Sequence, residues 1–200
     1  MKVISFAAQK GGCGKSALAI SSAVLAARDK RVLLIDADSQ STALQWRAGR
    51  NGNPPEVRRF QTELVSNDEF DFVFIDTPGH IEGSVSAALR LSAFVLVPAS
   101  PTLADARAMP PIAKMLTALK RPFAFVLTQV PNRGTRADET AAALAELGDV
   151  APVRIAQRVV WQDAYAASLG VSEYEPSGAA TRELTALWQW LNARLKRIGA

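Results

Sequence analysis

The chain has 200 residues, of which 48% are apolar and 21% are charged, and its formal net charge is +4. This length and composition fit one α/β domain over residues 1–200, and no apolar run is long enough to span a bilayer. No charged leader or cleavage site precedes the first apolar run, so we expect a cytoplasmic protein. A single cysteine, Cys13, excludes an internal disulfide and a multi-cysteine metal site. The pI of about 9.5 permits binding to an acidic polymer without requiring it.

Apolar runs alternate with helical patterns along the chain. Strands are expected over residues 2–7, 31–36, 57–60, 72–76, 94–98 and 123–128, with a short one near Val153. Helices are expected over residues 15–28, 42–48, 82–91, 111–119, 136–147, 161–168 and 181–196. The Pro110-Pro111 pair indicates that the fourth of these helices begins or restarts there.

Several of the expected strands are nearly continuous in Val, Ile, Leu and Phe. Such runs are typical of strands that are buried on both faces of a parallel sheet. The alternation of strands and helices therefore predicts a doubly wound, mostly parallel α/β sheet flanked by helices. Ligands of such sheets bind at the carboxyl ends of the strands.

A glycine-rich segment follows the first expected strand. Residues 9–16 read Gln-Lys-Gly-Gly-Cys-Gly-Lys-Ser and lead into the first expected helix. This pattern predicts the phosphate-binding loop of a P-loop NTPase, in which Lys15 reaches the β- and γ-phosphates and Ser16 binds Mg²⁺. An ordinary phosphate loop has no need of the second lysine, Lys10. The loop residues expected around the phosphates are Gly11, Gly12, Cys13 and Gly14.

Polar residues also end three later strands. Residues 36–40 read Asp-Ala-Asp-Ser-Gln, and residues 76–79 read Asp-Thr-Pro-Gly. An apolar strand that ends in Asp before a glycine turn is the Walker B pattern, so Asp76 is expected to hold Mg²⁺ through a water. Thr128 and Gln129 follow a later strand, where a nucleotide base could lie. A Rossmann dinucleotide site is the weaker alternative, because it has no use for Lys-Ser at the start of the helix.

The segment Lys-Gly-Gly-Cys-Gly-Lys-Ser at residues 10–16 resembles the deviant Walker A motif of the ParA/MinD ATPases. Residues 36–40 resemble the Asp-x-Asp-Pro-Gln switch of that family, with Ser39 in place of the usual proline, and residues 76–79 resemble its second switch. The resemblance runs from the first residue to about residue 175. Other similar positions are Trp46, residues 98–101 followed by Asp105, and residues 170–173.

The resemblance implies an ATPase that works as a dimer. In the family pattern Lys15 binds the phosphates of its own ATP, whereas Lys10 reaches the phosphates held by the partner subunit, so that two subunits enclose two ATP molecules. Asp38 orients the attacking water, and Thr128 and Gln129 are candidates for contacts near the adenine. Hydrolysis depends on Mg²⁺ and proceeds by positioning and charge neutralisation, slowly until a partner protein completes the site.

The resemblance is greatest to small ParA-type partition ATPases, which lack an N-terminal helix-turn-helix domain. It implies an ATP-bound dimer that binds nucleoid DNA without sequence preference, in plasmid or chromosome partition or in cargo positioning. A ParB-like or cargo-adaptor protein would stimulate hydrolysis. Surface arginines and lysines would make salt-dependent phosphate contacts. The candidates are Arg133, Arg136, Arg154, Arg158, Arg182, Arg194, Lys196 and Arg197.

Two other functions fit parts of the sequence. A MinD-like membrane-cycling protein would use residues 181–200, an amphipathic pattern with a basic end, on a lipid surface. Because most such helices pack on their own core, we expect this one to dock on the sheet and the protein not to bind membranes. A P-loop small-molecule kinase would use Arg154 and Arg158 as lid arginines, whereas a metal-cluster protein would need more cysteines than the chain has.

Overall fold

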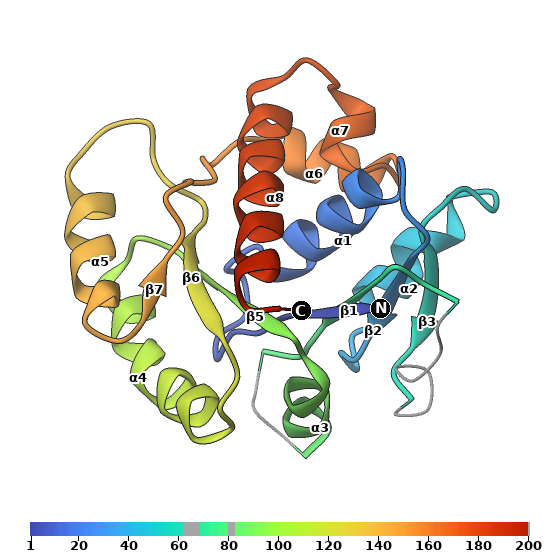
Figure 1. Ribbon diagram of the computed structural model, residues 1–200. Helices are drawn as coiled ribbons and strands as arrows, with labels where there is room; N and C mark the ends of the chain where they lie inside the picture. Colours follow the sequence, from blue (N-terminus) through green and yellow to red (C-terminus); the bar gives the residue numbers. More distant parts are fainter. Residues whose placement is uncertain (62–68, 80–82, 200) are drawn as a thin grey trace.

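The fold is a seven-stranded parallel sheet with helices on both faces (Figure 1). The computed structural model describes residues 1–61, 69–79 and 83–199. The strand order is β3-β2-β4-β1-β5-β6-β7, and every neighbouring pair is parallel. The predicted doubly wound parallel sheet is thus confirmed. The strands are β1 (Lys2–Phe6), β2 (Val32–Asp36), β3 (Glu56–Arg59), β4 (Phe72–Asp76), β5 (Phe94–Ala99), β6 (Phe123–Leu127) and β7 (Asp149–Val150).

The register of the central strands brings their carboxyl ends to one edge. Asp36 at the end of β2 lies opposite Asp76 at the end of β4, and Asp76 lies opposite Phe6 at the end of β1. The chain places β2, β3 and β4 on one side of β1, and β5, β6 and β7 on the other. The end of β1 is therefore at a topological switch point, where doubly wound sheets bind ligands.

Eight helices cover the sheet in the described part of the chain. Figure 1 shows α1 and α8 on one face, with α3 and α4 on the other. Residue 82, the expected start of the third helix, lies outside the described residues. The helices are α1 (Lys15–Ala26), α2 (Thr42–Ala48), α3 (Gly83–Leu91), α4 (Leu103–Ala118), α5 (Arg136–Ala145), α6 (Val160–Ala166), α7 (Val171–Tyr174) and α8 (Ala179–Arg197).

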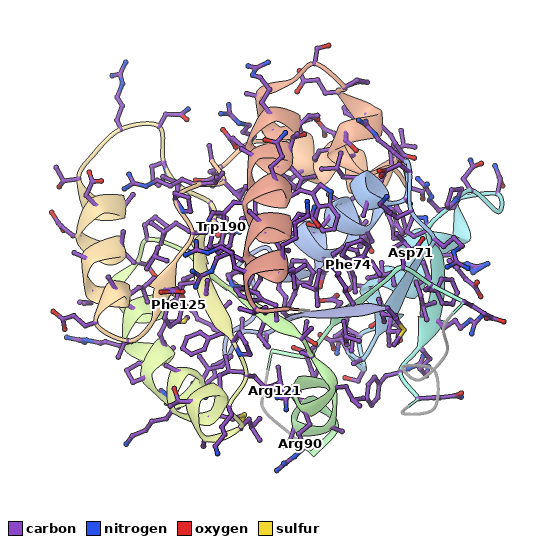
Figure 2. The ribbon with its side chains drawn as sticks, in the orientation of Figure 1. Asp71, Phe74, Arg90, Arg121, Phe125 and Trp190 are labelled. Atoms are coloured by element: carbon purple, nitrogen blue, oxygen red, sulfur yellow. The ribbon has the colours of Figure 1, made fainter. Side chains whose placement is uncertain are left out.

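Alternating residues of each strand pack into different layers of the core. Ile4 and Phe6 of β1 belong to the cluster that includes α1 and α8, whereas Val3 points to the opposite layer. Phe125 of β6 packs with residues of α4 and α5 (Figure 2). The central strands are apolar on both faces, as their continuous apolar runs predict.

The expected break at Pro110-Pro111 is wrong, because α4 runs through both prolines. Thr102 caps this helix by accepting a hydrogen bond from the backbone N–H of Asp105, so the helix starts eight residues before Pro111 at Leu103. Both prolines are exposed. Water can therefore satisfy the carbonyls that lack a donor, while the opposite face of α4 packs on the core.

The expected last strand near Val153 is also displaced. The structure places β7 at Asp149–Val150, paired with β6. Pro152 follows shortly after and has no N–H to donate to a sheet ladder. The short α7 was not expected at all.

The last helix, α8, docks on the sheet as expected. Its residues Leu184, Leu187, Leu191 and Leu195 are at most 1% exposed. The ring of Trp188 packs against Phe72 and Phe74 of β4, and Trp190 forms a T-shaped pair with Phe94 of β5. Figure 2 labels Phe74 and Trp190. No helix among residues 1–61, 69–79 and 83–199 is both long and apolar enough to cross a membrane.

Candidate functional site

A glycine-rich loop joins β1 to α1 at the carboxyl edge of the sheet. Gly12 and Gly14 have φ angles of 83° and 79°, which residues with a Cβ rarely adopt. Gly14 is the N-cap of α1. Apart from the adjoining residues of the chain, no atom of the described residues lies within 4 Å of the position that a Cβ would take on Gly11, Gly12 or Gly14. The loop is thus an open cradle at a helix N-terminus, a geometry that binds phosphate through backbone N–H groups.

Lys15 forms a buried ion pair with Asp76. Its Nζ lies 2.8 Å from Oδ1 of Asp76, and the two side chains are 7% and 0% exposed. Burial raises the pKa of Asp76, and the charge of Lys15 opposes this effect. Oδ2 of Asp76 is buried and has no hydrogen-bond partner in the described part of the protein.

This unused carboxylate oxygen fits a Mg²⁺ site. Ser16 follows Lys15 in α1 and lines the same cavity. No group of three or more His, Cys, Asp or Glu side chains gathers among the described residues. A metal here would therefore rely on one or two protein oxygens, water and phosphate, which is how Mg²⁺ binds in nucleotide sites.

Lys10 is held by a different acid. Its Nζ lies 2.9 Å from Oδ1 of Asp105 in α4, and the lysine side chain is 51% exposed. Oδ2 of Asp105 accepts a hydrogen bond from the backbone N–H of Ser100. Burial raises the pKa of Asp105. The hydrogen bonds from Lys10 and Ser100 and the charge of Lys10 lower the pKa by more than burial raises it, so it lies below the ordinary value. The sequence did not reveal that Asp105 is the partner of Lys10.

The two carboxylates after β2 have different surroundings. Asp36 is fully buried and accepts hydrogen bonds from the backbone N–H groups of Asp38, Ala43 and Leu44. It therefore fixes the loop and the start of α2. Asp38 is half-buried, accepts a hydrogen bond from the N–H of Gln40, and lines the cavity beside the glycine-rich loop.

Thr128 and Gln129 hold the glycine-rich loop by hydrogen bonds to its carbonyl groups. The Thr128 hydroxyl donates to the carbonyl of Cys13 at 2.8 Å, and Nε2 of Gln129 donates to the carbonyl of Gly12 at 2.7 Å. Oε1 of Gln129 pairs with the hydroxyl of Ser100. Both residues also line the cavity. Their contact with an adenine stays a prediction, whereas their contact with the loop is direct.

The cavity beside the loop has a volume of about 530 Å³. The glycine-rich loop forms one side, and a segment around the start of α6, absent from the predicted site, forms another. The sequence signal for it was weak: two aromatic residues four positions apart in an expected helix. Residues of this wall are Ile155, Ala156, Gln157, Arg158, Trp161, Gln162 and Tyr165.

The basic residues named as DNA contacts divide into two groups. Arg154 and Arg158 form ion pairs of 2.6 Å with Asp138 and Glu183, and Arg194 pairs with Asp149. Arg182 donates to the carbonyl of Ser177. The others are exposed and form no ion pair with the described residues: Arg133, Arg136, Lys196 and Arg197.

Comparison with known proteins agrees with this geometry. The family description "CobQ/CobB/MinD/ParA nucleotide binding domain" matches residues 4–171. A curated relative, the maintenance of carboxysome distribution protein A of Halothiobacillus neapolitanus, is 23% identical over an alignment 190 residues long that covers 87% of this chain and 88% of that protein.

Solved structures share the fold across almost the whole chain. A putative plasmid partition protein from Borrelia burgdorferi bound to AMPPNP has a TM-score of 0.81 at 17% identity, with 96% of this chain and 99% of that chain covered. MinD in a MinC:MinD complex from Aquifex aeolicus gives a TM-score of 0.78 at 16% identity, with 96% of each chain covered. At these identities the structural matches establish the fold alone.

Proposed function

We propose that this chain, which belongs to the CobQ/CobB/MinD/ParA family of nucleotide-binding domains, is a Mg²⁺-dependent ATPase that positions cargo by cycling between monomer and ATP-bound dimer. One observation carries the proposal. A single phosphate-binding loop contains two lysines, of which Lys15 is buried inside the subunit and Lys10 lies half exposed at the surface. We take residues 1–200 as one ATPase domain.

In this proposal, the glycine-rich loop and Lys15 bind the subunit's own ATP. The backbone N–H groups of residues 11–16 and the start of α1 would hold the phosphates. Lys15 would exchange its contact with Asp76 for the β- and γ-phosphates, and Ser16 and Asp76 would then hold Mg²⁺, with Asp76 acting through a water. The metal, when bound, neutralises charge that develops on the phosphates.

In this proposal, Lys10 promotes dimerisation by binding a phosphate held by the partner subunit. In the free subunit its ammonium group rests on Asp105. To reach a phosphate across a two-fold axis, Lys10 has to leave that carboxylate. A γ-phosphate carries more charge than one carboxylate, so ATP in the partner subunit can compete for the lysine more strongly than ADP.

In this proposal, Asp38 is the residue that promotes hydrolysis. This carboxylate lies at the cavity, near the loop, in a segment that Asp36 fixes from behind. It would orient the attacking water for transfer of the γ-phosphoryl group. A ParB-like or cargo-adaptor protein would complete the site and accelerate turnover.

Cargo positioning is favoured over the two alternatives. The curated relative is named for carboxysome distribution and one structural neighbour for plasmid partition, which supports a positioning role here. Docking of α8 on the sheet removes its apolar stripe as a membrane-binding face. Arg154 and Arg158, the lid arginines of the kinase alternative, are engaged by acids of the same chain.

We further propose that the ATP dimer binds DNA without sequence preference and is then nucleoid-associated in the cytoplasm. The test is DNA retardation with ATP, ADP and no nucleotide over a series of salt concentrations. We expect binding only with ATP, independent of sequence, and weaker as salt rises. Equal binding in all three states, or binding to anionic vesicles in place of DNA, would contradict it.

A pair of variants locates the surface. Because each lost phosphate contact lowers the salt slope by about 0.9, replacing both Arg133 and Arg136 with Ala should lower it by about 2. Arg31→Ala is the matched control, since Arg31 is also exposed but is paired with Asp71.

A further inference from the structure

The cavity wall at residues 155–165 is held from two sides. On the first side, the end of β6 fixes it by backbone hydrogen bonds. The N–H of Ile155 donates to the carbonyl of Leu127, the N–H of Val130 donates to the carbonyl of Ile155, and the N–H of Gln157 donates to the carbonyl of Val130. These bonds align the segment with the sheet edge.

On the second side, one carboxylate of α8 fixes the same segment. Oε2 of Glu183 accepts a hydrogen bond from the N–H of Ala156 at 3.0 Å, and Oε1 accepts one from Nη2 of Arg158 at 2.6 Å. Glu183 is 21% exposed and Arg158 is 31% exposed. Both residues that Glu183 holds line the cavity, whereas Glu183 is not among the lining residues.

The glycine-rich loop and Lys15 line one part of the cavity, and residues 155–165 line another. With the phosphates of a nucleotide on the loop, its base and ribose would lie against the second part. There, Trp161 and Tyr165 of α6 offer aromatic surface and Gln157 offers amide groups. Planar aromatic and amide groups are suited to a base and a ribose.

We propose that Glu183 is a positioning residue for the base and ribose side of the nucleotide. It acts through Ala156 and Arg158 and touches no ligand itself. Without it, Ala156 loses the acceptor of its N–H, and the Arg158 guanidinium, whose Nε is already buried without a partner in the described chain, loses its ion pair. This inference rests on the proposed nucleotide site and adds to it a role for the last helix.

The test compares ADP with pyrophosphate by titration calorimetry in the presence of Mg²⁺. Pyrophosphate reports the phosphate end alone. Glu183→Ala should weaken ADP binding about tenfold, the worth of a lost hydrogen bond to a charged group, and leave pyrophosphate binding unchanged. Glu183→Gln, which keeps an oxygen for the N–H of Ala156, should recover part of the loss.

Asp149→Ala is the matched control. It also removes an ion pair to α8, through Arg194, but Asp149 is not among the residues that line the cavity. We expect it to bind both ligands like wild type. ADP affinity in Glu183→Ala equal to wild type, or an equal loss for ADP and pyrophosphate, would overturn the proposal. Failure of the wild-type protein to bind ADP or ATP would instead refute the proposed function.

Discussion

Lys10 and Lys15 lie five residues apart, yet their acidic partners place them in different surroundings. Lys15 pairs with the fully buried Asp76, and a charge pair out of water is stable only while both members are satisfied. The side chain of Lys10 is 51% exposed, so its ammonium group can gain water or another anion when it leaves Asp105, which is itself buried and keeps the hydrogen bond from the N–H of Ser100. This difference supports the proposal that Lys10 is the lysine released to the partner subunit.

Asp38 should matter for turnover and not for binding. Asp38→Ala removes the group proposed to orient the attacking water but leaves the phosphate loop intact. We expect ATP binding like wild type, hydrolysis slower by about 10² or more, and a long-lived dimer. Phosphate release and nucleotide titration measure the two quantities.

Ser39→Ala is the control for this variant, because Ser39 is the exposed neighbour in the same segment. Turnover in Asp38→Ala equal to that of Ser39→Ala would remove Asp38 from the mechanism.

The lowered pKa of Asp105 leads to a prediction of how the stability of the fold depends on pH. Its pKa in the folded protein is lowered, so its ionised form contributes stability above the unfolded value of about 3.9, and this contribution is lost as pH falls through the lower folded value. Asp105→Asn should flatten the fall of the thermal unfolding midpoint below about pH 4. A slope identical to wild type would show that the Lys10–Asp105 pair is not maintained in solution.

At the level of elements, features with a local sequence signature were predictable and those that depend on distant partners were not. The glycine loop, the buried strands and the docked α8 follow from spacing and apolar periodicity. The contacts of Thr128 and Gln129 with the loop join residues more than 100 positions apart, and Glu183 reaches the wall from 25 residues away. No periodicity encodes such pairs.

Local rules also failed where tertiary packing outweighed them. The buried face of α4, with Met109, Ile112 and Leu116, holds the helix together through two prolines that favour a break. At β7, by contrast, a proline did end the element. Pro152 has no N–H to donate, and the strand stops before the apolar Val153.

The prolines of α4 give a stability prediction. Pro111→Ala restores an N–H that can donate to the carbonyl of Arg107, and it relieves the ring clash with the preceding turn. We expect the free energy of unfolding in urea to rise by about 1–2 kcal/mol, since the helix gain exceeds the entropy that the unfolded chain regains.

Pro122→Ala is the control for this helix, because Pro122 is exposed and lies outside it. It should be neutral or slightly destabilising. A loss of stability in Pro111→Ala would mean that the proline shapes α4 in a way that its packing needs.

On the scale of the whole molecule, α8 lies over the sheet beside α1 and runs from the cavity wall to a pair of exposed basic residues (Figure 1). Near its start, Glu183 holds the cavity wall, and near its end, Lys196 and Arg197 are exposed basic residues. One helix thus contributes both a hydrogen-bond acceptor for the cavity wall and two exposed basic residues.

The central claim is that Lys10 makes ATP binding a dimerisation signal. Sedimentation equilibrium of wild type, Lys10→Ala and the surface control Lys30→Ala, each with AMPPNP, ADP or no nucleotide, tests it most directly. Wild type and Lys30→Ala should be dimers with AMPPNP and monomers otherwise, whereas Lys10→Ala should bind AMPPNP and remain a monomer. An AMPPNP dimer of Lys10→Ala as stable as that of wild type would contradict the account.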